Sequence, residues 1–442
     1  EDTDGDKKCD YCNADLEADA VATLTVDGKT YFYTDLPSAV AKANTTGGTI
    51  QLRQDVTGLT EKLDINHSKG FAITLDLNDH TISGADHSGS TLLAVSTFGT
   101  VTIDDTSSAK TGKIVGENGG GYAVCVSDGL SGQAGYALGT AGGELIITGG
   151  TFNSPVDAKD KLIVSGGTFN GAVTINARGA TITGGTFNGA FSMSAQPDVF
   201  SGGTFTQQAV FSSVSNILTG GEFQKGIKST DKKLYELLAE NKAYQTAPDW
   251  LDDDTTYLCS DTGRSVTVAE APIHSVTLTV NGNPVALEDN KGRFSVELGT
   301  DVTLTASCEG SMEAPYGTWY PTHGGTEDGG TANPVKQGTG KSLSYTLPPE
   351  DLTVGTHTYR VSFCSKNPGP VGQVTGYYKG AQIIITVTPR DLKNATVEYY
   401  TTDNPTVVTY NPLNNHICGL LIDKVTLDGV KLEDGTDYII SG

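Results

Sequence analysis

A seven-residue motif recurs five times between residues 147 and 224 and constrains the fold more than any other feature. The copies read ITGGTFN, VSGGTFN, ITGGTFN, FSGGTFT and LTGGEFQ, and they begin at Ile147, Val164, Ile182, Phe200 and Leu218. Their phenylalanines follow one another at spacings of 17, 18, 18 and 18 residues, at Phe152, Phe169, Phe187, Phe205 and Phe223. A chain that returns above its own start after a fixed number of residues stacks equivalent side chains about 4.8 Å apart. The motif therefore predicts a β-solenoid with a buried phenylalanine stack, turning at the glycine pairs because glycine has no Cβ atom to clash.

Alternating apolar and polar residues extend this pattern towards the N-terminus, in segments that begin at Thr49, Ile73 and Thr100. At about 18 to 22 residues per turn, the tract from Thr49 to Lys228 predicts roughly nine turns and a length of roughly 45 Å. Residues 117–143 are rich in glycine and predict a long loop that projects from one corner.

Amphipathic helices are expected to cover both ends of the solenoid, which would otherwise expose unpaired strands and apolar core. The first follows Asp35 as N-cap, with an apolar face of Leu36, Ala39, Val40 and Ala43. The second follows Thr230 as N-cap, with an apolar face of Leu234, Leu237 and Leu238.

The segment from the first helix through GGTIQL and ITLDLNDHTISG resembles the pectin-lyase-like right-handed parallel β-helix proteins. The GGTF repeats resemble those of large surface proteins of Gram-positive bacteria, and the resemblance covers residues 20–245. It implies a right-handed parallel β-helix and leaves the activity open, because such proteins include lyases, hydrolases, tailspikes and adhesins. A left-handed helix also uses about 18 residues per turn, but no hexapeptide pattern of small and aliphatic residues persists here.

Beyond Pro272 the pattern changes to short strands at turn-punctuated intervals, which is typical of a β-sandwich. DVTLTASC resembles the B strand of an immunoglobulin-like (Ig-like) domain, Trp319 its strand-C tryptophan and Tyr359 its tyrosine corner. The residue two positions after Tyr359 is Val361, where antibody domains have cysteine. Because Cys308 and Cys364 lie at the ends of the expected B and F strands, we expect a disulfide between them.

These patterns predict an all-β chain of five segments. They are a tail with a CxxC motif (1–20), a parallel β-helix with capping helices (21–245), a linker or cap (246–272), an Ig-like β-sandwich (273–388) and a small C-terminal β-domain that reads as truncated (389–442). The end of the last segment, LEDGTDYIISG, resembles the ends of small β-grasp-like or Ig-like repeats in Gram-positive surface proteins.

Charge and hydropathy limit the partners of the chain. Lys and Arg number 29 and Asp and Glu number 52, so the formal net charge is −23. Such a surface repels nucleic acid and anionic membranes, which both need a basic footprint. No apolar stretch approaches the roughly 20 residues needed to span a bilayer. The chain begins at Glu1 without a leader, and we expect an excised piece of a secreted or cell-surface protein.

Acidic residues do not form the pairs that glycosidic cleavage requires at about 5–10 Å separation. In the regular repeats they do not recur at the repeat spacing with a basic partner, and they are only Glu144, Asp157, Asp160, Asp198 and Glu222. The densest ionisable patch is Asp76, Asp79, His80, Asp86 and His87, followed by the adjacent pair Asp104 and Asp105. In relatives the position of NDHTISG is a turn motif, so we expect no catalytic residue and no cofactor.

Seven cysteines leave the redox compartment open. Cys9 and Cys12 have zinc-knuckle spacing, but zinc needs four ligands and no second pair follows. Half a zinc site, a local disulfide and free thiols all remain open for this pair. Cys125 is expected to be a buried apolar residue, and the sequence does not indicate the state of Cys259 or Cys418.

The function expected from the sequence is that of a non-enzymatic, adhesin-type cell-surface protein. Its β-helix would present a flat face rich in Thr, Ser and Asn to a glycan or a host surface protein. The alternatives are a polysaccharide lyase or glycoside hydrolase on a β-helix, and a phage-like fibre. The sequence does not indicate the oligomeric state.

Overall fold

The computed structural model divides into two compact units, Glu1–Ala271 and Pro272–Gly442. It describes residues 7–8, 15, 17–65, 71–85, 92–95, 99–117, 124–126, 144–176, 178–246, 249–251, 261–322, 334–368, 376–389, 425–427 and 430–432. Cys9, Cys12, Asp86, His87, Cys259 and Cys418 lie outside these residues, as do most of the 117–143 loop and most of 389–442. The predicted all-β class is confirmed, and no helix among the described residues is long and apolar enough to cross a membrane.

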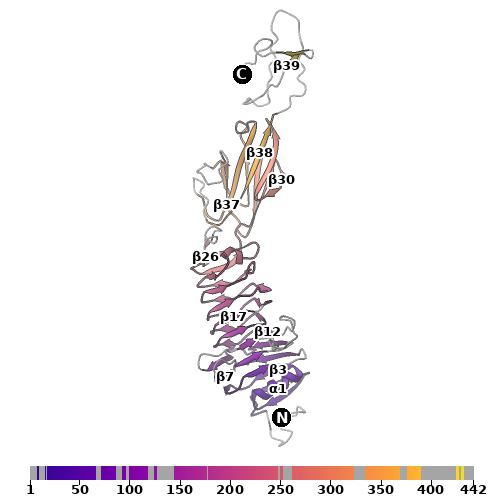
Figure 1. Ribbon diagram of the computed structural model, residues 1–442, viewed down its shortest axis with the longest axis vertical. Helices are drawn as coiled ribbons and strands as arrows, with labels where there is room; N and C mark the ends of the chain where they lie inside the picture. The colour runs from indigo at the N-terminus through magenta and orange to yellow at the C-terminus, as the bar shows by residue number, and fades with distance from the viewer. Residues whose placement is uncertain are drawn as a thin grey trace, which may run out of the picture. The chain divides into compact units, whose positions relative to one another are not determined.

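Three sheets, mostly parallel, build the first unit (Figure 1). Sheet 1 consists of β2 (Lys29–Tyr33), β1 (Ala22–Val26), β3 (Gly48–Leu52), β6 (Ala72–Asp76), β9 (Thr100–Asp104), β12 (Glu144–Ile147), β15 (Lys161–Val164), β18 (Thr181–Ile182) and β21 (Val199–Phe200). Sheet 2 consists of β27 (Asp249–Trp250), β26 (Lys242–Thr246), β28 (Val266–Glu270), β24 (Glu222–Phe223), β22 (Thr204–Phe205), β19 (Thr186–Phe187), β16 (Thr168–Phe169), β13 (Thr151–Phe152), β10 (Lys113–Glu117), β7 (Thr81–Ala85) and β4 (Val56–Leu59). Sheet 3 consists of β25 (Ile227–Ser229), β23 (Ala209–Phe211), β20 (Phe191–Met193), β17 (Val173–Ile175), β14 (Val156–Ala158), β11 (Val124–Val126), β8 (Leu93–Val95) and β5 (Leu63–Ile65).

Consecutive strands from β3 to β25 visit the three sheets in rotation, and we call each set of three a rung. Eight rungs are described. The last has an isolated bridge at Leu218 in place of a strand in sheet 1. The expected nine turns are too many, because the early rungs are long. Equivalent sheet 1 positions are 25, 28 and 44 residues apart, from Ile50 to Leu75, Ile103 and Ile147. Parallel sheets visited in this order are compatible with a β-helix.

The phenylalanines of the motif form one continuous stack inside sheet 2. They are in register on neighbouring strands, and each is at most 1% exposed. Neighbouring ring centroids from Phe152 to Phe223 lie 5.0, 4.8, 4.6 and 4.8 Å apart, with interplanar angles of 5–9°. A second buried file runs along sheet 1, through Ile147, Val164, Ile182, Phe200 and Leu218.

The two glycines of each motif are required for different reasons. A Cβ atom on the first would strike the backbone of the preceding rung, as at Gly184, where it would lie 2.3 Å from the carbonyl oxygen of Ser165. The second has a positive φ, which is +93° at Gly185, and L side chains rarely adopt that conformation. The glycine pair therefore fixes both the close stacking of the corners and their turn.

The two ends of the first unit differ from each other. The helix expected after Asp35 is present as α1 (Leu36–Thr46), and the Asp35 carboxylate accepts a hydrogen bond from the Ser38 N–H at 2.8 Å. Its four expected apolar residues are buried against the core. The second expected helix is wrong: only a short 3₁₀ segment, η1 (Leu234–Leu237), forms, and it follows Lys233 rather than Thr230.

Backbone pairing with the last rung accounts for this difference. Asn216 donates to the Glu236 carbonyl at 2.7 Å, and Ile217 donates to the Leu237 carbonyl at 2.9 Å. Ala239 in turn donates to the Leu218 carbonyl at 3.0 Å. The Leu237 carbonyl also accepts from the Leu218 N–H, so both of its lone pairs are used by the last rung, and the chain leaves η1 along the sheet edge.

Two further sheets build the second unit around a separate core. Sheet 4 consists of β30 (Asn283–Val285), β29 (Ser275–Val280), β33 (Thr303–Glu309) and β36 (Ser342–Thr346). Sheet 5 consists of β31 (Leu287–Glu288), β32 (Lys291–Glu297), β38 (Tyr378–Thr388), β37 (Gly355–Cys364), β34 (Tyr316–Thr322) and β35 (Lys336–Thr339). The remaining elements are η2 (Pro349–Asp351) and the hairpin of β39 (Val425–Leu427) and β40 (Val430–Leu432). Trp319 is fully buried between the sheets, and its Nε1 donates to the Leu343 carbonyl at 3.1 Å.

Cys308 and Cys364 are both buried and both free thiols, so the disulfide expected between them is absent from the structure. Strand alternation gives the reason. Cys308 belongs to the core that sheets 4 and 5 share. On β37 the residues that reach this core are Tyr359, Val361 and Phe363, and Cys364 has the opposite parity. Successive side chains of a strand point to opposite faces, so the two sulfur atoms lie on opposite sides of sheet 5.

Candidate functional site

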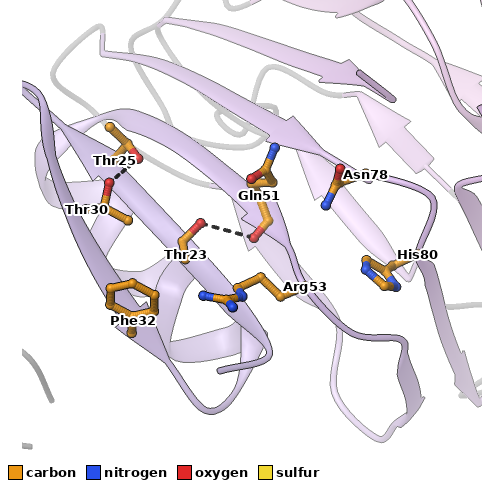
Figure 2. A pocket seen from close by; sticks show the side chains of 8 residues that line it. All are labelled: Thr23, Thr25, Thr30, Phe32, Gln51, Arg53, Asn78 and His80. Carbon is orange, nitrogen blue, oxygen red and sulfur yellow. Dashed lines mark hydrogen bonds between the residues drawn. The ribbon is translucent and has the colours of Figure 1, made fainter. Parts of the chain in front are cut away.

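An open, polar depression of about 370 Å³ lies on the outward face of sheet 1, at its N-terminal end. It is lined by side chains from β1, β2 and β3 and from the turn after β6 (Figure 2). Antiparallel pairing of β1 with both β2 and β3 brings these strands together and sets Thr23 opposite Phe32 on one side and Gln51 on the other. The lining residues are Thr23, Thr25, Thr30, Phe32, Gln51, Arg53, Asn78 and His80.

Arg53 is the cation of the depression. Its guanidinium carbon lies 5.4 Å from the centroid of the Phe32 ring, which orients the exposed arginine over an aromatic face. The Lys7 ammonium lies 5.7 Å from the same centroid, and the ring itself is only 5% exposed. Among the described residues Arg53 forms no ion pair, so its donors can bind a ligand oxygen.

The amides beside Arg53 are held by one hydrogen bond each. Gln51 Nε2 donates to Asp76 Oδ2 at 2.8 Å, and Asn78 Nδ2 donates to the Leu52 carbonyl at 2.9 Å. His80 Nδ1 lies 3.4 Å from Asp55 Oδ1. These contacts hold the amide groups of Gln51 and Asn78 in place and leave their amide oxygens as acceptors in the same depression as Arg53. The depression thus offers both donors and acceptors on planar side chains.

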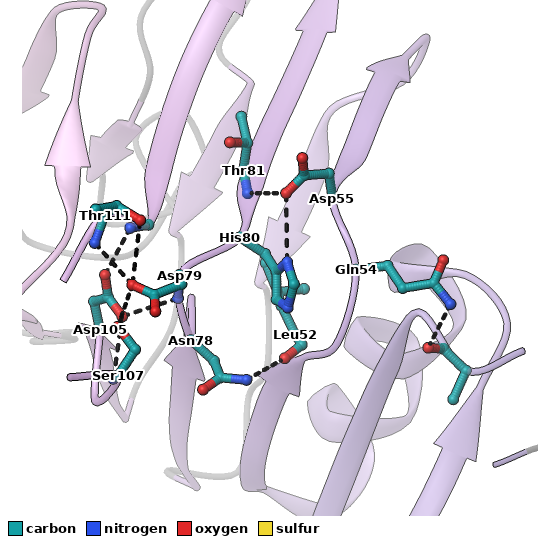
Figure 3. A network of polar contacts seen from close by, with 12 residues as sticks. Leu52, Gln54, Asp55, Asn78, Asp79, His80, Thr81, Asp105, Ser107 and Thr111 are labelled. Carbon is teal, nitrogen blue, oxygen red and sulfur yellow. Dashed lines mark hydrogen bonds and ion pairs between the residues drawn. The ribbon is translucent and has the colours of Figure 1, made fainter. Parts of the chain in front are cut away.

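Asp76 and Asp79, the described aspartates of the predicted densest ionisable patch, hold the neighbouring turns together, and Figure 3 shows the contacts of Asp79. Asp76 is 3% exposed and accepts hydrogen bonds from the N–H and hydroxyl of Thr106, at 3.0 and 2.6 Å, and from Gln51 and Asn78. Burial alone would raise the pKa of Asp76, but these hydrogen bonds outweigh it and hold the pKa below its ordinary value.

The carboxylates of Asp79 and Asp105 both contact one hydroxyl group, that of Ser107. Ser107 Oγ lies within hydrogen-bonding distance of Asp79 Oδ1, and it lies 2.6 Å from Asp105 Oδ1. Asp105 is fully buried and also accepts from the N–H groups of Asp79, Ser107 and Gly112. Hydrogen bonds from Ser107 and Thr111 lower the pKa of Asp79. Asp104 accepts from the Asp105 N–H at 2.8 Å.

These contacts define what the aspartate patch can do. Asp79 and Asp105 face each other through the Ser107 hydroxyl. Their acceptor positions bind backbone N–H groups of two successive turns, and this stabilises the corner between sheets 1 and 2. No group of three or more metal-binding side chains suited to a metal ion occurs among the described residues.

The acids of the regular repeats are spread over different sheets. Glu144 on sheet 1 accepts from Thr100 at 3.0 Å and lies 3.3 Å from the Lys161 ammonium. Asp157 on sheet 3 lies 3.3 Å from Lys159 and is 4% exposed. Cys125 lies on β11, in register with Asp157 of the next rung. The repeats therefore do not bring the expected acids together.

Hydroxyl and amide side chains form regular files on the outward faces of the rungs. Asn170 donates to Asn153 at 2.7 Å, and Asn188 donates to Asn170 at 2.9 Å. A threonine file on sheet 2 consists of Thr151, Thr168, Thr186 and Thr204, which are in register and half-buried. These files are the part of the described structure that corresponds to the face rich in Thr, Ser and Asn expected from the sequence. Some of their side-chain hydrogen bonds join neighbouring rungs, as between Asn153, Asn170 and Asn188.

Comparison with family models, with curated proteins and with solved structures gave no match for this chain.

Proposed function

We propose that the first unit is a right-handed parallel β-helix of the pectin-lyase-like kind and that it binds a glycan without cleaving it. The second unit would be an Ig-like domain of a secreted or cell-surface protein of a Gram-positive bacterium. The GGTF spacing, the three sheets visited in rotation and the net charge of −23 support this proposal.

The depression on sheet 1 carries the proposal. A sugar presents pairs of hydroxyl groups, each of which donates and accepts, and such pairs match side chains with fixed planes of donors and acceptors. Arg53, Gln51 and Asn78 supply these planes within one open surface. Each is oriented by a separate contact, to Phe32, Asp76 and Leu52 respectively. Preorganisation of this kind lowers the entropic cost of binding.

Size favours a glycan over a host protein at this place. A stable protein interface buries about 800 Å² on each partner around a core of large apolar side chains. The depression, of about 370 Å³, fits a few sugar rings, and Phe32 is covered by two cations rather than offered to a partner. Against cleavage, Asp76 is occupied by hydrogen bonds from Thr106 and Gln51, and Asp55 accepts from the Thr81 N–H beside His80.

A glycan array probed with the full chain tests this proposal, with titration calorimetry on the ligands that bind. Arg53→Ala should weaken binding roughly 10- to 100-fold, because hydrogen bonds to a charged group contribute about 1.5–3 kcal/mol each. Arg178→Ala is the matched control, since it removes an equally exposed arginine that does not line the depression. Equal affinity of both variants for every glycan bound would refute the site, and turnover of any polysaccharide would refute the non-enzymatic assignment.

A further inference from the structure

The outward face of sheet 4 consists of hydroxyl side chains joined across the strands. Thr303 lies 3.0 Å from Thr346 and Thr305 lies 2.8 Å from Ser344, measured between hydroxyl oxygens. Ser307 Oγ donates to Ser342 Oγ at 3.2 Å. These contacts order the side chains of β36, which is the last strand at its edge of the sheet.

The backbone of β36 has unpaired groups at every second residue. Cys308 donates to the Lys341 carbonyl and Leu347 donates to the Val302 carbonyl, so the odd-numbered residues of β36 are those hydrogen-bonded to β33. In an antiparallel pair the residues between them direct both N–H and C=O away from the partner strand. Ser342, Ser344 and Thr346 are therefore the residues whose backbone faces outward. All three are exposed, and their backbone groups have no other partner within the described residues.

This edge lacks the devices that usually protect an edge strand, which are charge, proline, a bulge or very short length. Of the other three edge strands of sheets 4 and 5, β30 contains Pro284, β31 has two residues including Glu288, and β35 contains Lys336. The five residues of β36, SLSYT, include neither charge nor proline, and they pair with β33 without a bulge.

We propose that β36 is a self-association edge, at which two copies of this chain pair antiparallel about Ser344 and join their four-stranded sheets into one. The register follows from the strand itself. With Ser344 opposite Ser344 of the second copy, Ser342 faces Thr346 and Thr346 faces Ser342. All three pairs join residues whose backbone groups point outward, so each pair forms two hydrogen bonds and the edge is fully satisfied.

The side chains suit the same register. The order hydroxyl, apolar, hydroxyl, apolar, hydroxyl reads alike in both directions, so hydroxyls meet hydroxyls on the outer face as they already do between β33 and β36. On the core side, Leu343 would lie opposite Tyr345 of the second copy. Leu343 is 8% exposed and Tyr345 is half-buried, so pairing extends an existing apolar layer. A two-fold contact of this kind closes at the dimer.

Charge complementarity does not assist this contact, since each copy carries a formal charge of −23. Long-range repulsion between the copies is screened by salt, whereas backbone hydrogen bonds at an uncharged edge are not. The dimer should therefore strengthen as salt is raised, unlike an association based on ion pairs. This dependence is independent of glycan binding at the first unit.

Sedimentation equilibrium of the full chain, at low and high salt, tests the proposal. The wild type should show a concentration-dependent monomer–dimer equilibrium that shifts towards dimer at high salt. Ser344→Pro removes an N–H that points outward and no backbone hydrogen bond to β33, although it also removes the hydroxyl contact with Thr305. It should lower the association constant about tenfold or more. Ser344→Lys should do the same by placing two like charges at the two-fold axis.

Thr277→Lys is the matched control, because Thr277 lies exposed on β29 of the same sheet, two strands from the edge. This variant should still dimerise, and a melting curve for each variant checks that it is folded. Hydrogen exchange adds a direct reading, since the amides of Ser342, Ser344 and Thr346 should be slowed in dimer and fast in monomer. A wild type that stays monomeric at high salt, or a Ser344→Pro variant that dimerises equally, would overturn the proposal.

Discussion

Phe187→Ala tests whether the phenylalanine stack is a principal source of stability in the first unit. Phe187 is 1% exposed and contacts three rings, Phe169 at 4.8 Å, Phe205 at 4.6 Å and Phe191 at 5.2 Å between centroids. Truncation of a buried phenylalanine costs about 3–5 kcal/mol, from lost burial and from the cavity that remains. We expect a loss of about 4 kcal/mol in the free energy of unfolding of this unit.

Phe152→Ala is the matched control from the end of the same stack. Phe152 is equally buried, but among the described residues it contacts a single ring, Phe169, at 5.0 Å, because the preceding strand supplies Ile114 at this position. Each aromatic pair contributes about 0.5–1.5 kcal/mol beyond its buried area. The two additional ring contacts of Phe187 should therefore make its truncation about 1–3 kcal/mol more costly than that of Phe152.

Differential scanning calorimetry of the full chain measures these losses, since each unit has its own core. At roughly 2–4 °C per kcal/mol for a unit of this size, Phe187→Ala should lower one transition by roughly 8–16 °C. Trp319→Phe identifies the other transition, because Trp319 is buried in the second unit only. The reasoning fails if Phe152→Ala is as damaging as Phe187→Ala, or if Phe187→Ala costs less than about 1 kcal/mol.

Three further outcomes are expected. Gly184→Ala should lower the first transition by an amount equivalent to about 1–3 kcal/mol, because its Cβ would lie 2.3 Å from the Ser165 carbonyl oxygen; an unchanged transition would refute the steric argument. The free energy of unfolding of the first unit should fall as pH is lowered from about 5 to about 3. The cause is that the pKa of Asp76 is lower in the folded than in the unfolded chain, so the stability that Asp76 contributes is complete only above the unfolded pKa of about 3.9. Asp76→Asn should reduce this dependence of stability on pH, and an unchanged dependence in urea titrations would contradict the prediction. Peptide mass spectrometry without reduction should find Cys308 and Cys364 as thiols. Cys308 should also resist alkylation in the native state, because burial raises the pKa of its thiol to about 11. A peptide with a disulfide between Cys308 and Cys364 would disprove that they lie on opposite faces of sheet 5.

Features that depend on a repeat or on local spacing could be predicted from the sequence. The phenylalanine stack follows from a spacing of 17 to 18 residues, since strands in register must place Phe169 and Phe187 side by side. The helix after Asp35 follows equally from its N-cap and its apolar spacing. In both cases the residues that make the contact are themselves the signal.

Features that depend on which strands become neighbours could not be predicted in the same way. The prediction of the second helix was wrong because its carbonyls, including that of Leu237, accept hydrogen bonds from the last rung. No local sequence pattern indicates that these backbone bonds compete with the helix. The disulfide fails because two cysteines near one pole of a sandwich can still differ in strand parity. The sequence signal against the disulfide was Val361, which stands where antibody domains have the bonded cysteine. Cys364 lies three residues further along the same strand, and an odd separation places its side chain on the opposite face.

The depression on sheet 1 was missed for a related reason. Arg53 and Phe32 are 21 positions apart; Phe32 lies on β2 and Arg53 directly follows β3, and these two strands are joined only through β1. The alternation of inward and outward side chains along a strand gives the face on which Arg53 or Phe32 lies. It does not indicate that the two side chains lie on one continuous surface. A hairpin at Asp27 and Gly28, both with positive φ, was the local feature from which this antiparallel pairing could have been anticipated.

The near-identity of successive corners has a consequence for how such a chain can change in evolution. From Phe169 to Phe205 every strand of sheet 2 is a Thr-Phe pair that meets a neighbour of the same composition, and the glycine corners repeat with it. Unequal recombination that adds or removes one 18-residue period would join two strands that already fit each other. The length of this part can therefore change in whole periods, and the N-terminal hairpin with its depression would stay intact in longer and shorter descendants.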